Sequence, residues 1–273
     1  MGRYSEFDVR MKKYENVSKN TLMTKVPVAI RIDGKAFHTF TKGFNRPFDK
    51  LLIKSMQETM KYLCENIQGC VLGYTQSDEI TLILTDYSKL ETSAWFDYKV
   101  QKLCSISASM ATMKFNQYFY EQAMNIFCDF ENGNIPRFEE GYYTDKNIME
   151  LANVDDGVKL KYFENCGKAL FDSRCFNIPK EEVVNLIYWR QQDAIRNSIQ
   201  MVGCANFNHK ELKYKSCNDI QNMLFTEKGI NWNDIPTHLK RGSCCIKTKN
   251  GWIVDNNIPI FKNEGREYIE KLI

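Results

Sequence analysis

The sequence has no pair of cysteines at CxxC spacing, although ten cysteines are scattered along its 273 residues. It has only three histidines, and no apolar run approaches the roughly 20 residues needed to cross a bilayer. These absences exclude a zinc site of the usual spacing, a small disulfide scaffold and a membrane span. The first residues are polar and charged, so we expect no secretory signal and a reducing, cytoplasmic location.

A strong charge of either sign is also missing, because the formal net charge is only +3. A surface for nucleic acid must therefore be a local patch and not a property of the whole molecule. The chain contains no internal repeat and no low-complexity tract. Hydrophobic residues make up 43% and charged residues 26% of the chain, which is typical of a globular protein with a substantial core.

Two short segments place an acidic residue where an apolar, β-prone run ends. Residues 26–32 alternate as a strand does, which puts Val28, Ile30 and Ile32 on one face and Ala29, Arg31 and Asp33 on the other. Residues 70–74 and 79–85 read as two further strands, joined by a tight connection that contains Asp78. Paired carboxylates at neighbouring strand ends suit Mg²⁺, and two such ions can serve a nucleotidyl transfer.

The other periodicities complete a β-α-β-β-α-β order. We expect helices over 4–20, from Pro47 onward and over 95–123, and a fourth strand over 170–178. The helix over 95–123 is expected to bury Leu103, Ile106, Met110 and Met113. This order predicts an α+β fold with a ferredoxin-like antiparallel sheet. In such a sheet, strands one and three are central neighbours, and Asp33 and Asp78 converge at one edge.

Two regions fall outside that order. Residues 131–165 are rich in Gly, Asn, Asp and Glu, and we expect a loop insertion there. Residues 180–273 are expected to form a helical C-terminal subdomain packed on the sheet, which begins with a helix over 180–203. Shorter strands are expected near 244–246 and 252–254. The chain is therefore divided into a sheet domain over 1–179 and a helical subdomain over 180–273.

Several motifs resemble those of the tRNA-His guanylyltransferase family and its template-dependent 3′-to-5′ polymerase relatives. The motifs are Arg31-Ile-Asp-Gly-Lys-Ala-Phe-His38, Arg46-Pro47, Tyr74-Thr-Gln-Ser-Asp-Glu79, Trp189-Arg-Gln-Gln-Asp193, Tyr4-Ser-Glu-Phe-Asp8 and Arg241-Gly-Ser243. The resemblance thus covers nearly the whole chain. The first and third motifs, in this order, make a specific combination, whereas either alone is weak.

The resemblance implies a nucleotidyltransferase with a palm-like catalytic domain over residues 1–179. The 3′-hydroxyl of an incoming nucleotide would attack an activated 5′-phosphate of tRNA, which is either a triphosphate or an adenylylated monophosphate. GTP and other nucleoside triphosphates would be substrates, ATP would serve 5′-activation, and two Mg²⁺ ions would be cofactors. The resemblance also implies a homotetramer, with tRNA as partner and no membrane.

The resemblance also assigns roles to individual positions. Asp33, Asp78 and Glu79 would be catalytic, and Asp33, Asp78 and the backbone carbonyl of Gly34 would hold the metal ions. The nucleotide-binding residues would be Asp33, Gly34, Lys35, Ala36, Phe37, His38, Arg46, Ser77 and Asp78. The backbone from Gly34 to His38 would cradle the triphosphate, while Arg46 would offset its charge. Glu79 has an alternative role, which is to pair with a nearby Lys or Arg, and the role of Lys42 is left open.

A polar and aromatic set lies at helical spacing on the helix after residue 180. It comprises Trp189, Arg190, Asp193, Arg196 and Asn197. One interpretation is a surface for RNA or its 5′-phosphate, extended by Lys210, Lys213, Lys215, Lys240, Arg241, Lys247 and Lys249. The alternative is an interface between the two domains in which these side chains satisfy one another.

Two departures from the family pattern bear on specificity. The stretch Ile195-Arg-Asn-Ser198 stands where members dedicated to tRNA-His carry His-Ile-Asn-Asn, which favours template-dependent repair of 5′-truncated RNA. Arg46 replaces a frequent Lys, and only Arg can bind an anion with a bidentate fork. Two rival functions stay open. One is a nucleotide cyclase of the same fold, and the other is a non-catalytic RNA-binding module with structural carboxylates.

Overall fold

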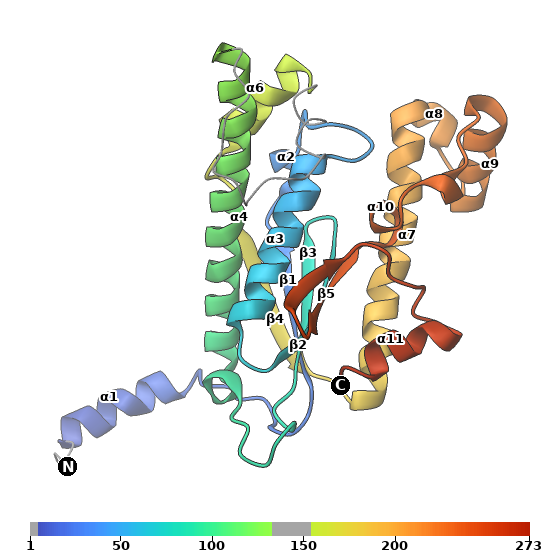
Figure 1. Cartoon of the computed structure of the whole chain (residues 1–273). Coiled ribbons are helices and arrows are strands. Elements are labelled where there is room, and N and C mark those ends of the chain that lie inside the picture. The colour runs from blue at the N-terminus through green and yellow to red at the C-terminus, as the bar shows by residue number, and fades with distance from the viewer. Residues whose placement is uncertain (1–4, 133–153) are drawn as a thin grey trace.

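A six-stranded antiparallel sheet forms the centre of the molecule, with helices on both of its faces (Figure 1). The computed structural model describes residues 5–132 and 154–273. The strands are β1 (Val28–Gly34), β2 (Cys70–Gln76), β3 (Glu79–Leu84), β4 (Phe171–Asn177), β5 (Ser243–Thr248) and β6 (Gly251–Asp255). Their order across the sheet is β4-β1-β3-β2-β5-β6, so β1 and β3 are neighbours, as the sequence predicts.

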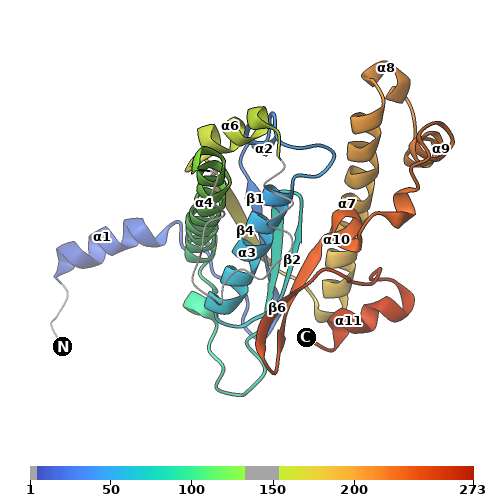
Figure 2. The ribbon, with the colours of Figure 1, turned by 45° about the horizontal axis from the view of Figure 1, so that its top comes forward.

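Two long helices cover one face of the sheet and a third covers the other (Figure 2). Helices α3 (Lys50–Asn66) and α4 (Val100–Asn132) lie on the first face, and α7 (Val183–Asn206) lies on the second. The shorter helices are α1 (Glu6–Asn16), α2 (Phe37–Phe40), α6 (Asp156–Asn165), α8 (His209–Leu212), α9 (Cys217–Lys228), α10 (Thr237–Arg241) and α11 (Glu267–Glu270). Within the described ranges, no helix combines the length and apolarity that crossing a membrane requires.

The predicted alternation of the first strand separates two cores. Val28, Ile30 and Ile32 are fully buried on the side of α3 and α4. Ala29 is buried in the opposite core, beneath Val183 and Ile187 of α7. Side chains alternate along a strand, so Arg31 and Asp33 share the α7 side with Ala29. Strand β1 therefore presents its charged residues to the α7 side and its large aliphatic residues to α3 and α4, while β2 and β3 add Leu72 and Ile83 to the apolar core under α7.

An aromatic cluster fills the end of the core under α4. Phe37, Phe40, Phe44, Phe115, Phe119, Tyr162 and Phe171 pack with ring centroids 4.9 to 5.9 Å apart. The buried stripe of α4 consequently runs through Leu103, Ser107, Ala111, Phe115 and Phe119.

The predicted stripe of the long helix was thus wrong in part. Ile106 and Met113 are 38% and 52% exposed, and only Leu103 of the predicted stripe is fully buried, with Met110 half-buried. The two phenylalanines have larger apolar areas to bury, and they turn the helix so that positions spaced by four residues face the sheet. The aromatic residues therefore determine which face of α4 is buried.

The C-terminal part contributes to the sheet as well as to the helical layer. The predicted strands near 244–246 and 252–254 form β5 and β6, and β5 pairs with β2. Residues 180–273 are therefore not purely helical. The far end of α7 packs with α9 in a separate small core, which is made of Ile199, Val202, Phe207, Ile220, Leu224 and Trp232.

The expected loop insertion and two of the expected helices differ from the structure in their bounds. Most of the loop insertion expected over 131–165 lies outside the described residues, and its last part forms helix α6. The helix expected from Pro47 begins only after Asp49, whose side chain caps it by accepting from the Leu52 amide. Helix α1 is shorter than predicted and starts at a capping box between Ser5 and Asp8. It has no buried residue and points away from the rest of the molecule (Figure 1).

Candidate active site

The two strand-end carboxylates lie at one edge of the sheet. Asp33 is opposite Glu79 in the β1–β3 register, and the next amide, that of Gly34, donates a 3.0 Å hydrogen bond to the backbone oxygen of Asp78. Ser77 and Asp78 form the tight connection between β2 and β3, and Ser77 has a left-handed backbone with φ +49°. Residues 45 positions apart in the chain are thereby placed side by side, as the strand order predicts.

The electrostatics of this edge reflect that proximity. Burial raises the pKa of the Asp78 carboxyl above its usual value, and the charges of Asp33 and Glu79 raise it further. The Ser77 hydroxyl donates a 3.0 Å hydrogen bond to Asp78, which opposes the rise. Two carboxylates that repel each other in this way attract a cation between them.

The segment after Asp33 is anchored in the aromatic core. Ala36 has a left-handed backbone, and Phe37 then turns its ring into the aromatic cluster. A Cβ on Gly34 would lie 2.3 Å from the Phe37 ring, so glycine is needed for this close approach. Only the backbone of Phe37, and not its side chain, is therefore offered to a ligand.

A cavity of about 640 Å³ opens beside this segment. Its volume is in the range that holds a nucleotide-sized ligand. Three stretches of chain form its lining, namely Gly34, Ala36, Phe37, His38, Thr41, Lys42, Phe44, Asn45, Arg46, Pro47, Asp49 and Leu52, then Ser77 and Asp78, and finally Asn197, Gln200, Met201 and Cys204 of α7. We call the strand ends that carry Asp33 and Asp78 the carboxylate edge. The carboxylate edge and α7 thus form two walls of one cavity.

Most of the predicted nucleotide-binding residues line this cavity. They are Gly34, Ala36, Phe37, His38, Arg46, Ser77 and Asp78, and Asn197 joins them from the predicted RNA surface. Asp33 is half-buried next to Asp78 without lining the cavity. Lys35 is exposed and Glu79 is buried, and neither lines it.

The sequence interpretation missed the wall that α7 provides. Gln200 and Cys204 follow Asn197 by three and seven residues, so the three share one helix face. An extension of the polar face from Asp193 and Asn197 along the helix would have found them. The loop residues Thr41 and Asn45 carried no such periodic signal.

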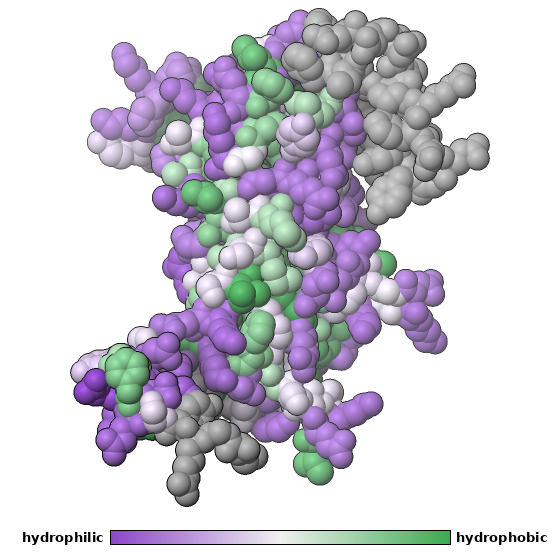
Figure 3. Space-filling model, turned by 90° about the vertical axis from the view of Figure 1, so that its left-hand side faces the viewer, coloured by the Kyte–Doolittle hydropathy of each residue, from purple (hydrophilic) through white to green (hydrophobic). Residues whose placement is uncertain are grey.

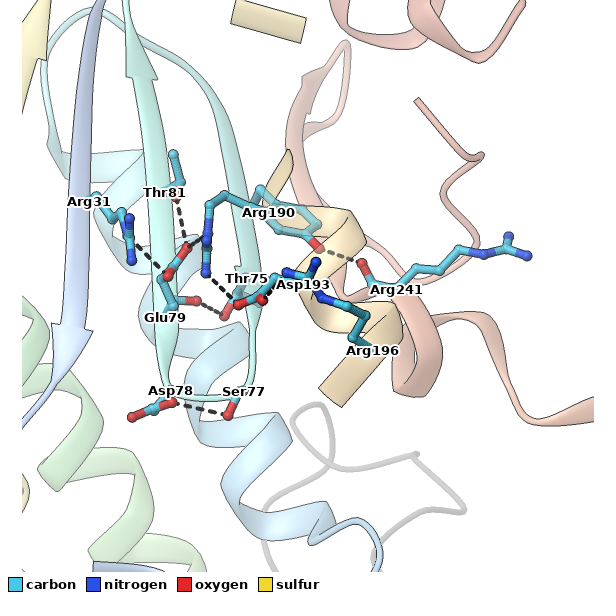
Figure 4. Close-up of polar contacts among 11 residues, drawn as sticks. Arg31, Thr75, Ser77, Asp78, Glu79, Thr81, Arg190, Asp193, Arg196 and Arg241 are labelled. Carbon is cyan, nitrogen blue, oxygen red and sulfur yellow. Dashed lines mark hydrogen bonds and ion pairs between the residues drawn. The ribbon is translucent and has the colours of Figure 1, made fainter. Parts of the chain in front are cut away.

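The remaining members of the predicted RNA surface separate into two kinds. The Trp189 ring is 52% exposed and the Arg196 side chain 59%, so both can meet a partner. Arg190 is buried, and its Nε donates a 2.7 Å hydrogen bond to Glu79 (Figure 4). Asp193 accepts from Arg190 and from Arg196, at 2.9 and 2.7 Å. Arg190 and Asp193 thus follow the alternative interpretation, in which these side chains satisfy one another.

The donor set at the carboxylate edge fits a cation that shares its ligands with a substrate. The described residues contain no cluster of three or more His, Cys, Asp or Glu side chains that could hold a metal ion by itself. Asp33 and Asp78 supply two carboxylates, which is the number that Mg²⁺ uses when phosphate oxygens complete its shell.

The comparisons with known proteins identify the family of the chain. The family model described as tRNAHis guanylyltransferase matches residues 8–179, which is more than half of the chain. The chain therefore belongs to the tRNA(His) guanylyltransferase family. It is a nucleotidyltransferase that adds nucleotides to tRNA in the 3′-to-5′ direction.

Individual relatives and solved structures resemble the chain over most of its length. It is 25% identical to the tRNA(His) guanylyltransferase of Saccharomyces cerevisiae, over 88% of this chain and 89% of that protein. It is 28% identical to an uncharacterised protein of Acanthamoeba polyphaga mimivirus, over 85% of this chain and 74% of that protein. A bacterial tRNA(His) guanylyltransferase-like protein solved in complex with ATP is 41% identical, with a TM-score of 0.79 and coverage of 98% and 99%. A similar bacterial structure in complex with GTP is 38% identical, with a TM-score of 0.73 and the same coverage.

Proposed function

We propose that this enzyme extends the 5′ end of tRNA with nucleotides chosen by pairing, using the cavity to bind a nucleoside triphosphate. The observation that carries the proposal is the meeting of Asp33 and Asp78 at the edge of a cavity lined by Gly34, His38 and Arg46. ATP and GTP are the proposed ligands, because the two bacterial relatives were solved with them. We regard residues 1–179 as a palm-like, ferredoxin-like catalytic domain and 180–273 as the part that completes the cavity.

Different residues of the cavity have different roles in the proposed reaction. The backbone from Gly34 to His38 and the Arg46 guanidinium hold the triphosphate, and Ser77 keeps the Asp78 carboxylate oriented. Asp33, Asp78 and the Gly34 carbonyl are the proposed ligands for two Mg²⁺ ions. When bound, these ions supply charge stabilisation to the attacking 3′-oxygen and the leaving phosphate oxygen.

The choice of repair over strict guanylylation of tRNA-His rests on α7. Ile195-Arg-Asn-Ser198 lacks the histidine of the dedicated family members, and Asn197 of this stretch lines the cavity. Without a dedicated contact at that position, pairing with the opposite RNA strand is left to select the added nucleotide.

The deciding experiment supplies full-length and 5′-truncated tRNAs, with 5′-monophosphate or triphosphate ends, together with each nucleoside triphosphate. Products that follow Watson–Crick pairing on truncated tRNAs support the proposal. Guanylate added only to full-length tRNA-His contradicts the repair assignment. A cyclic nucleotide formed without RNA favours a cyclase, while RNA binding without any product favours a binding module.

We propose that Trp189 and Arg196 contact the RNA, because both are exposed on the α7 surface that leads to the cavity. A stacked base would quench the fluorescence of Trp189, whereas Trp95 and Trp232 are buried. Trp189→Phe should bind tRNA with less quenching, and Trp189→Ala should bind it more weakly. Lys210, Lys213, Lys215, Lys247 and Lys249 are exposed and would add phosphate contacts, whereas Lys240 is buried and donates to the Asn233 carbonyl. Affinity that does not fall with salt would refute that footprint.

We also propose that copies of the chain associate, as the family resemblance implies for a homotetramer. The outer side of α4 carries a band of hydrophobic side chains, shown in green between purple regions in Figure 3. Among the exposed large hydrophobic residues, α4 contributes Ile106 and Met113, and α1 contributes Phe7 and Tyr14. Sedimentation of the wild type and of Met113→Glu tests this. A wild-type monomer at micromolar concentration would contradict it.

A reducing compartment such as the cytoplasm remains part of the proposal. The nine cysteines of the described residues are all free thiols, in keeping with such a location. Imaging of a tagged protein in its own cell would test the assignment, and secretion would contradict it.

A further inference from the structure

Glu79 directly follows Asp78, yet its side chain is held by two arginines away from the cavity (Figure 4). Arg190 Nε donates to its Oε1 at 2.7 Å, and Arg31 Nε donates to its Oε2 at 3.0 Å. The backbone oxygen of Glu79 accepts from the Thr75 hydroxyl at 2.9 Å. Both carboxylate oxygens of Glu79 therefore already have charged partners.

The ion pair between Glu79 and Arg190 is buried, so the loss of only one of its two charges is costly. The Glu79 side chain is 5% exposed and that of Arg190 is 7% exposed. Removal of one member of such a pair leaves an uncompensated buried charge, whereas removal of both is often tolerated. Burial lowers the pKa of Arg190, but the contacts with Glu79 and Asp193 outweigh it and keep the guanidinium charged.

The two arginines come from the elements that form two walls of the cavity. Arg31 lies on β1, two residues before Asp33. Arg190 lies on α7, seven residues and about two helical turns before Asn197. Asp193 lies between Arg190 and Asn197 on α7, and it accepts a further hydrogen bond of 2.9 Å from Arg190. Glu79 thus connects the carboxylate edge to the helix whose next turns line the cavity.

We propose that Glu79 is a positioning residue, which acts through Arg190 to set the separation between the Asp33–Asp78 edge and α7. This rests on the proposed use of the cavity for a nucleotide. It differs from the sequence-based expectation of a catalytic role for Glu79, since both oxygens of the carboxylate accept from arginines and the residue does not line the cavity. A change of about 1 Å in such a wall is enough to lower a rate by about 100-fold.

A double-mutant cycle separates the two roles. Glu79→Gln and Arg190→Met each remove one charge with little change of size, and the double variant removes both. We measure the affinity for fluorescently labelled GTP, the kcat and KM for nucleotide addition, and the Mg²⁺ concentration that gives half of the maximal rate. For a positioning role, each single variant binds labelled GTP more weakly and has a kcat/KM about 10- to 100-fold lower than the wild type. The affinity and the kcat/KM of the double variant are then no lower than those of the single variants.

The Mg²⁺ dependence identifies the alternative. A positioning role predicts the wild-type Mg²⁺ midpoint in all three variants. A metal-ligand role predicts a raised midpoint for Glu79→Gln alone, and losses in the two single variants that multiply in the double variant. Either of these last two results would overturn the proposal.

Two controls keep the test readable. Thermal melting shows whether each variant folds. In the double variant Arg31 loses Glu79 but its side chain is 20% exposed, and Asp193 keeps Arg196, so the double variant remains interpretable if a single variant does not fold. The matched control is Arg266→Gln, which breaks a solvent-accessible contact with Glu270 of α11 and should behave as wild type. Binding of labelled GTP requires no RNA, so the cycle in affinity can be read even if the wild type fails to extend tRNA. That failure would contradict the proposed function instead.

Discussion

The two faces of the sheet are built on different physical principles. Towards α3 and α4, β1 presents Val28, Ile30 and Ile32, which are sealed by aliphatic and aromatic side chains. Towards α7, the same strand presents Ala29 to a second apolar core, and Arg31 and Asp33 to ion pairs and the cavity end of that face. One strand therefore serves both sides through its alternation. The apolar side supplies stability and anchors Phe37 beside the cavity, and the charged side places chemical groups at a cost in stability.

The largest effect should come from the carboxylates of the charged side. Asp33→Ala or Asp78→Ala should lower nucleotide addition by about 10³-fold or more, because these variants lose transition-state charge stabilisation. The melting temperature should not fall, since repulsion between two carboxylates is relieved. Single-turnover assays and calorimetry measure both quantities.

Asp97→Asn is the matched control for the carboxylate variants. Asp97 is an exposed acid with a left-handed backbone before α4, a conformation that Asn tolerates. This variant should keep wild-type activity. Near-normal turnover in Asp33→Ala would show that the charged side does not perform the chemistry, and the contrast between the faces would lose its functional meaning.

The opposite result is expected on the apolar side. Phe119→Ala should lower the free energy of unfolding by about 3–5 kcal/mol, because it leaves a cavity amid Phe40, Phe44 and Phe115. At a temperature where the variant stays folded, its affinity for labelled GTP should fall by much less than its stability, because only Phe44 of these three neighbours lines the cavity. Urea denaturation and a binding titration check the two halves of this prediction.

Glu121→Ala changes an exposed residue two positions along the same helix and should stay within about 0.5 kcal/mol of wild type. If Phe119→Ala weakened GTP binding as strongly as it weakened the fold, the two faces would be coupled and not separate.

A smaller effect should distinguish two cations of the charged side. Arg46 lines the cavity and Lys35 does not. Arg46→Ala should weaken the binding of GTP by roughly 1.5–3 kcal/mol, as for a lost charge-assisted hydrogen bond, and Arg46→Lys should keep part of the affinity. Lys35→Ala should lower the affinity for GTP by less than Arg46→Ala does. Equal losses in competition titrations would mean that the cavity wall does not decide which cation binds the triphosphate.

The smallest effect concerns Asp193 and depends on pH. The hydrogen bond from Arg196 lowers the pKa of Asp193 below its usual 3.8, against an opposing effect of burial, and Arg190 lowers it further. A depressed pKa stabilises the fold above the unfolded value and loses that contribution as pH falls through the folded value. Asp193→Asn should therefore lower stability by roughly 1 kcal/mol at pH 7 and by less as pH falls below about 4.

Urea titrations at several pH values would measure this difference. Asp219→Asn, which alters an exposed helix cap with a similarly lowered pKa, is the matched control for an acid outside the network. A stability difference for Asp193→Asn that did not shrink in acid would assign its effect to packing and not to charge.

The alternation of residues 26–34 predicted the fold and the site together, because the same two-residue period that buries Ile30 exposes Asp33 to the other side. The β5–β6 pair was predicted as strands, but its place in the main sheet was not. Local patterns carry no information about which distant strand a segment pairs with. The stripe of α4 was misjudged because Phe115 and Phe119 outweigh Ile106 and Met113 in buried area.

The candidate site shows the same division between local and long-range information. The segment from Gly34 to His38 was predicted from its motif, and most of it lines the cavity. Helical periodicity places Gln200 and Cys204 on the face of Asn197, but only the path of α7 across the sheet shows that this face lines the cavity. Glu79 had two interpretations from the sequence, a catalytic group or a partner for a cation. The choice required the position of Arg190, 111 residues away.

The anchoring of Phe37 has a consequence for how a ligand enters. Its ring is fixed among Phe40, Phe115 and Phe171, and Gly34 packs directly against it. The backbone that would meet a triphosphate has therefore given up its conformational freedom during folding and not during association. For the proposed triphosphate site we therefore expect lock-and-key recognition, with association rates governed by diffusion and charge and not by the ordering of a loop.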